Sequence, residues 1–132
     1  MKIKKLIDVT KDNVELEGAV GAVKQLVLGS TDGAPAFSFR VFTLAPDGHT
    51  PRHSHPFEHL NYVLSGSGEL VDPDGNGQPV TAGDFAIVLP KLLSGLIFRN
   101  SPTFARPVDT LVLTLVIADE IPVLKAVILV LV

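Results

Sequence analysis

The stretch from residue 48 to residue 68, GHTPRHSHPFEHLNYVLSGSG, decides the fold because a histidine cluster leads directly into a β-like run. All four histidines of the chain lie within this stretch, and three of them, His53, His55 and His59, fall within seven positions. On a strand, residues i and i+2 point to the same side with Cα atoms about 6–7 Å apart, so His53 and His55 can face one ion. If the chain turns at Pro56, His59 can approach the same ion from the adjacent strand. The spacing therefore predicts a metal site made of three imidazoles.

Two other interpretations of the cluster remain open. The run HPFEH, residues 55–59, also matches the H-x-x-E-H pattern of helical metallohydrolases, in which Glu58 would be the general base. That helix would be short and would leave His53 unused. The third interpretation is a polar surface loop that carries its histidines by chance, and the tight clustering between prolines disfavours it.

The rest of the chain is typical of an all-β protein. Short runs rich in valine, isoleucine and phenylalanine alternate with turn sequences such as SGSG, DPDGNGQP and TAGD. Regular turns between short strands are typical of a β-sandwich or a small β-barrel. Strands are expected at QLVLG, AFSFRVFTL, LNYVL, GELV, FAIVL, GLIFR and TLVLTLVIA, residues 25–29, 36–44, 60–64, 68–71, 85–89, 95–99 and 110–118. In the second of these runs, Phe37, Phe39 and Val41 share one face while Ser38 and Arg40 share the other. The sequence predicts one β-domain over residues 1–132.

Composition excludes several classes of protein. A length of 132 residues fits a single core, and a net charge of −3 with scattered basic residues argues against nucleic acid as a partner. Cysteine is absent, which removes thiolate chemistry and zinc–sulfur sites. The N-terminal residues lack the apolar run of a signal peptide, so a cytoplasmic location is expected.

The C-terminal run 110–132 is apolar enough to raise the question of a membrane span. Asp119, Glu120, Pro122 and Lys125 interrupt it, and neither apolar piece reaches the ~18–20 residues that a span needs. Two strands are expected there and no membrane anchor. Residues 123–132 carry Lys125 as their single charge, so we expect them to be buried in the barrel wall or in a dimer interface.

The region from Gly48 to Gly66 resembles the first signature of the cupin superfamily, and the chain is most similar to small single-domain (type 2) cupins with an all-histidine metal site. Gly48, His53, His55 and Gly66 match the signature, and His59 stands where a glutamate is usual. The resemblance implies a small jelly-roll β-barrel, a homodimer, and His53, His55 and His59 as metal ligands. Glu58 precedes the ligand position, so it is expected on the outer face or behind the ligands.

The second cupin signature departs from the family pattern. GDFAIVLPKLLSGLIFRN, residues 83–100, has no histidine for the fourth ligand, and Ser94 or Leu96 stands in its place. The remaining histidine, His49, lies in a turn before Pro51 and is expected to stay outside the site. Three neutral imidazoles can still hold Zn, Fe, Mn, Ni or Cu, with positions left open for other ligands.

The function expected from this pattern is a metal-dependent dioxygenase or isomerase that acts on a small organic molecule. The alternative is a non-catalytic barrel that binds or senses a metal or a small ligand, and a metal-free structural barrel is the third possibility. No catalytic acid or base can be named outside the histidines. Tyr62, three positions after His59, is expected to face the other side of its strand and to serve in packing.

Overall fold

The structure is a computed structural model that describes residues 1–91, 95–97 and 111–118. In this part of the chain, the strands are β1 (Asp12–Asn13), β2 (Val20–Leu28), β3 (Phe37–His49), β4 (His59–Ser65), β5 (Ser67–Val71), β6 (Gly77–Thr81), β7 (Phe85–Val88), β8 (Gly95–Ile97) and β9 (Leu111–Ala118). Two short 3-10 helices, η1 (Leu6–Asp8) and η2 (Ser30–Asp32), complete the elements. The all-β expectation is confirmed. No helix among the described residues is long and apolar enough to cross a membrane.

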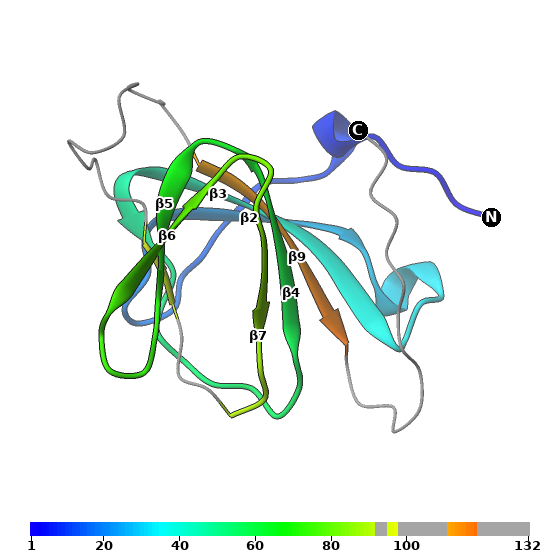
Figure 1. Ribbon diagram of the computed structural model, residues 1–132. Helices are drawn as coiled ribbons and strands as arrows, with labels where there is room; N and C mark the ends of the chain where they lie inside the picture. The colour runs from blue at the N-terminus through cyan, green and yellow to red at the C-terminus, as the bar shows by residue number, and fades with distance from the viewer. Residues whose placement is uncertain (92–94, 98–110, 119–132) are drawn as a thin grey trace.

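The strands pair in the order β6-β5-β8-β3-β9-β4-β7, and β2 pairs with β3 and carries β1. All of these pairings are antiparallel. In Figure 1, β4 and β7 cross in front of β2 and β3, so the sheet folds over on itself. Among the described strands, β6 and β7 stay at the two ends of this path, so these strands form a rolled sheet without a closed ring.

One face of the rolled sheet carries the core. Ala22, Leu44, Val63 and Val80, from four different strands, form the buried cluster, and Phe42 and Leu70 pack against it. We call this side the inner face. Because side chains alternate along a strand, Ser38 and Arg40 of β3 lie on the inner face together with Phe42 and Leu44. The sequence correctly separated the two faces of β3, and the structure shows that the face with the polar residues is the inner one.

The outer face of β2 and β3 is covered by the N-terminal residues. Gln25 of β2 is 4% exposed, and Val41, its partner on β3, is 3% exposed. The side-chain amide of Gln25 donates hydrogen bonds to the carbonyl oxygens of Leu6 (3.0 Å) and Val9 (2.7 Å). These bonds hold η1 against the sheet. They also satisfy an amide that would otherwise be costly to bury.

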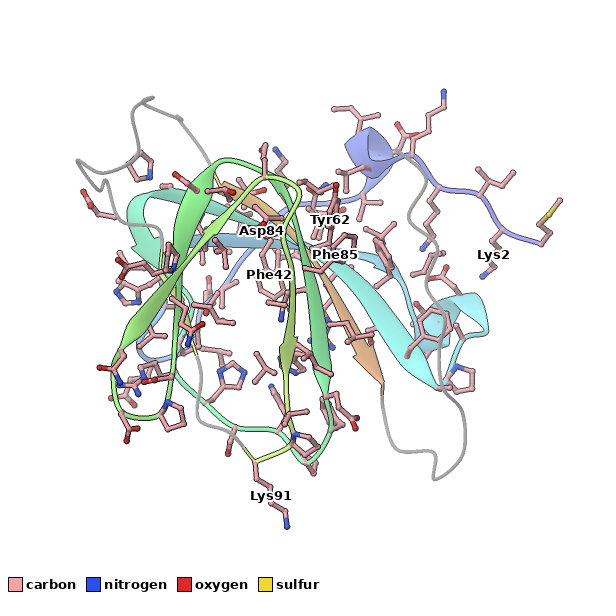
Figure 2. All side chains as sticks on the ribbon, in the orientation of Figure 1. Lys2, Phe42, Tyr62, Asp84, Phe85 and Lys91 are labelled. Atoms are coloured by element: carbon pink, nitrogen blue, oxygen red, sulfur yellow. The ribbon has the colours of Figure 1, made fainter. Side chains whose placement is uncertain are left out.

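The outer face of β4 and β7 is apolar and exposed. Phe85 is 75% exposed, and its ring lies 4.5 Å from that of Tyr62, its cross-strand partner (Figure 2). Leu60, Leu64 and Ile87 extend this surface. Tyr62 thus serves in packing on the side opposite to His59, as expected. The homodimer implied by the cupin resemblance stays a prediction.

Each of the seven strands expected between residues 25 and 118 overlaps one in the structure, but the sequence missed three features. The expected turn DPDGNGQP ends early, because Asp72 accepts hydrogen bonds from the backbone and side-chain amides of Asn76 and closes a tight turn. These bonds lower the pKa of Asp72, and β6 begins directly afterwards. β1 was not expected, and β3 runs on to His49. The run 123–132 lies outside the described residues.

Candidate metal site on the inner face

The histidine cluster lies where β3 leads into β4. β3 ends at His49, residues 50–58 form a loop that carries His53 and His55, and His59 is the first residue of β4. The helical H-x-x-E-H interpretation is therefore wrong. The physical reason is that His59 pairs with Val88 of β7 and with Ile117 of β9, so its backbone is extended and part of the sheet. Pro56 belongs to the bend before this strand.

The loop is fastened to neighbouring segments on both sides. The guanidinium of Arg52 donates to the carbonyl oxygens of Asp72 (2.7 Å) and Pro73 (2.9 Å) in the β5–β6 turn. The backbone N–H of Lys91 donates to the carbonyl oxygen of His55 at 2.6 Å. The Lys91 side chain itself points away from the sheet into solvent (Figure 2). Both segments of the loop that carry histidines are thus held by bonds to distant parts of the chain.

The three predicted ligands lie together. The ring centroids of His53 and His55 are 4.5 Å apart, those of His55 and His59 are 4.4 Å apart, and those of His53 and His59 are 6.5 Å apart. With a metal–nitrogen distance of ~2.1 Å, adjacent imidazoles on one ion have centroids roughly 4.5–5.2 Å apart. Two of the three separations are close to this range.

Two hydrogen-bonding facts fit a metal. The Nδ1 atom of His53 lies 2.8 Å from the carbonyl oxygen of Pro51, which can only accept, so Nδ1 carries the proton and Nε2 is left as a free lone pair. The Nε2 atom of His59 is buried and has no hydrogen-bond partner among the described residues. A buried polar atom without a partner is costly, and a bound ion would remove that cost.

The site is not fully arranged for an ion. Within the described residues, no group of three or more His, Cys, Asp or Glu side chains is already placed to hold a metal. His53 is exposed, whereas His55 and His59 are partly buried. The longest separation, from His53 to His59, is the one that a bound ion would have to shorten.

The pKa of His59 is lowered to about 4 by its burial and by the positive charges of His55, His53 and Arg40. His59 is therefore neutral at pH 7, the form in which an imidazole binds a metal. In the unfolded chain its pKa returns to about 6.5, so between pH 6.5 and pH 4 the unfolded state binds a proton that the folded state does not. Folding stability is then lost as the pH falls through this window.

We therefore expect the free energy of unfolding of the metal-free protein to decrease from pH 6.5 to pH 4, and His59→Gln to weaken this dependence. Urea unfolding at several pH values, with a chelator present, measures it. His49→Gln is the control, and its pH dependence should match that of the wild type. Equal slopes for His59→Gln and the wild type would contradict the low pKa of His59.

Other residues singled out by the sequence lie outside the cluster. The Nδ1 atom of His49 donates to the carbonyl oxygen of Gly18 at 2.9 Å, and no described ring contact joins His49 to the other histidines. Glu58 is exposed, as expected of an outer residue. Leu96 pairs with Leu70 on the neighbouring strand, and Ser94 lies outside the described residues.

Sequence reasoning missed two polar residues that lie near His59 on the inner face. Arg40 and Asn61 both pair with Leu115 of β9, from opposite sides, so they occupy one row across β3, β9 and β4. Asn61 lies two residues after His59 and therefore on the same face. The alternation in AFSFRVF already separated Arg40 from its apolar neighbours, but it did not say which face was the inner one.

The comparisons with known proteins agree with this fold. A family model described as "Cupin domain" matches residues 40–95. A solved structure, that of the polyketide cyclase RemF from Streptomyces resistomycificus, is 30% identical, with 98% of this chain and 87% of that chain covered and a TM-score of 0.79. The chain belongs to the cupin superfamily. The jelly-roll fold predicted from the sequence is thus confirmed.

More distant structures show the same fold. A predicted oxalate decarboxylase from Thermotoga maritima is 21% identical, with 89% of this chain and 98% of that chain covered and a TM-score of 0.73. An RmlC-like cupin from Shewanella frigidimarina is 15% identical, with 89% and 90% covered and a TM-score of 0.68. None of the curated proteins matches this chain.

Proposed function

We propose that this protein is a metal-dependent cupin enzyme that cyclises a small polyketide-like molecule on the inner face of its sheet. The observation that carries the proposal is the buried Nε2 atom of His59, which has no partner among the described residues and lies beside two further imidazoles. The likeness to a polyketide cyclase over nearly the whole chain supports the substrate class.

In this proposal His53, His55 and His59 would hold a divalent ion, with Mn, Fe, Zn, Ni and Cu all compatible with nitrogen ligands. When bound, the ion would supply a Lewis acid that polarises a carbonyl oxygen of the substrate. Cyclisation of a poly-β-ketone requires such polarisation, since a carbon–carbon bond forms when the enolate carbon attacks a ketone. A cyclisation that loses no atoms is an isomerisation, which is one of the two activities expected from the sequence.

The chain contributes surroundings as well as ligands. On the inner face of β4, Asn61 and then Val63 follow His59, and on β3 Phe42 follows Arg40. Val63 belongs to the core and Phe42 packs against it. An apolar floor of this kind favours a folded, compact substrate chain and limits the access of water to its reactive carbonyls. Asn61 and Arg40 supply polar groups at the level between the histidines and this floor.

A non-catalytic barrel that binds a metal or a small ligand is the second candidate. It is favoured by the missing histidine in the second signature and by the incomplete arrangement of the three rings. Such a protein would take up an ion or a ligand and release it unchanged.

Metal analysis of the purified protein and turnover assays separate these candidates. We expect about one ion per chain, and we expect ring-closed products by mass spectrometry when the metal-loaded protein is given synthetic linear oligo-β-ketones. The chelator-treated protein is the control, and its product should not exceed the spontaneous background. Oxygen uptake in the same assay would indicate a dioxygenase in place of a cyclase. A metal-loaded protein that releases every substrate of the panel unchanged would contradict the enzyme and favour the binding protein.

A further inference from the structure

Arg40 is a charged residue in the middle of the inner face. It is flanked along β3 by Ser38, which is 7% exposed, and by Phe42, which packs on the core. Across the sheet, Arg40 shares a row with Asn61, while His59 lies one row away on the same face. The positive charge of Arg40 is close enough to contribute to the lowered pKa of His59.

Within the described part of the chain, the guanidinium of Arg40 has no partner. Arg40 is partly buried, and across residues 1–91, 95–97 and 111–118 it has no ion pair or side-chain hydrogen bond. Arg52, by comparison, is exposed and uses its guanidinium to fasten the loop. A partly buried cation gains most when an anion with several acceptor atoms completes its hydrogen bonds.

The ligand that fits this group is a planar anion with two oxygens. The guanidinium presents its N–H groups as a fork, which matches the two oxygens of a carboxylate or of a β-diketone enolate. An anion bound there would also lie beside the histidines, on the face where the proposed chemistry takes place. Its negative charge would then be bound next to the reacting carbonyl groups.

We propose that Arg40 forms an anion-binding subsite that selects substrates carrying a carboxylate or an enolate and orients them toward His53, His55 and His59. This inference rests on the proposed function for the role of the bound anion, but binding itself does not need a metal. Arg40 is a specificity-determining residue in this scheme.

The test is calorimetric titration of the metal-free protein at pH 7.5 with 2-naphthoate and with its neutral analogue 2-naphthamide. A third probe, 2-acetyl-1,3-cyclohexanedione, is an enolate at this pH and separates enolate binding from carboxylate binding. We expect the wild type to bind at least one of the two anions about tenfold more tightly than the amide, the size of one charge-assisted contact. Arg40→Met should lose this preference, and Arg40→Lys should keep only part of it because the fork is gone.

Lys5→Met is the matched control, because it removes one positive charge from an exposed position on the N-terminal segment. It should bind all three probes as the wild type does, and circular dichroism checks that every variant is folded. An anion preference that survives in Arg40→Met, or that is equally lost in Lys5→Met, would overturn the subsite. So would a wild type that binds anions and amide alike. If the protein takes up no metal but Arg40→Met still loses the preference, the enzyme proposal fails while the subsite stands.

Discussion

Replacing His59 by leucine is expected to abolish metal binding without destabilising the metal-free protein. Loss of a group that merely supports a metal ligand costs about 10–100-fold in affinity, so loss of a ligand should cost at least about 100-fold. The buried Nε2 atom of His59 has no partner among the described residues, so its removal relieves a penalty. We expect the free energy of unfolding at pH 7.5 to stay unchanged or to rise by about 1 kcal/mol.

Competition with a chromogenic zinc chelator measures the affinity, and urea unfolding with a chelator present measures the stability. His49→Leu is the matched control: it lies outside the cluster and donates to the Gly18 carbonyl, so it should keep the metal and lose about 1 kcal/mol. The two variants should therefore show opposite patterns. Zinc affinity that is equal in His59→Leu and the wild type would reject His59 as a ligand. A marked loss of stability in His59→Leu would show that the His59 ring stabilises the metal-free protein by its packing.

The sequence predicted the histidine cluster because its evidence is local. The strand spacing expected for His53 and His55 is wrong, since both lie on the loop before β4, but the β-like run after His59 correctly predicted a strand there. The helical alternative failed because pairing with β7 and β9 outweighs a five-residue pattern. Spacing alone could not give the ring separations or the unpartnered Nε2 atom, since both depend on strands that are distant in the sequence.

The orientation of β3 could not be predicted for a related reason. Alternation separates two faces without saying which one is the inner face, and in the structure Arg40 and Ser38 lie on the inner face. The other face is also buried at Val41, because Gln25 and η1 cover it from outside. The sequence also did not predict that β3 continues beyond Leu44 to His49. Between the pairs Val20↔His49 and Ala22↔Leu44, β2 advances two residues while β3 advances five, so APDG bulges without ending the strand.

The second large effect is expected at Leu44, which is 0% exposed and belongs to the core cluster. Leu44→Ala leaves a cavity between strands that the sheet cannot close, because Leu44 pairs with Ala22 on one side and with Leu111 on the other. Substitutions of this kind cost about 2–5 kcal/mol, and full burial places this one at about 4 kcal/mol. That is a large part of the stability of a domain this size.

Leu64→Ala is the matched control, because it makes the same chemical change at a residue that is 39% exposed on the outer face of β4. It should cost less than about 1 kcal/mol. Urea unfolding of the metal-free variants measures both values, and similar losses would mean that the core does not lie on the inner face.

The same pair of variants tests how the candidate site depends on the core. Leu44 lies four residues along β3 from Arg40, on the same face, so a cavity beneath Phe42 should loosen the row that holds Arg40 and Asn61. Zinc affinity should then fall less in Leu44→Ala than in His59→Leu, because the imidazoles remain, while the anion preference weakens with the packing that supports it.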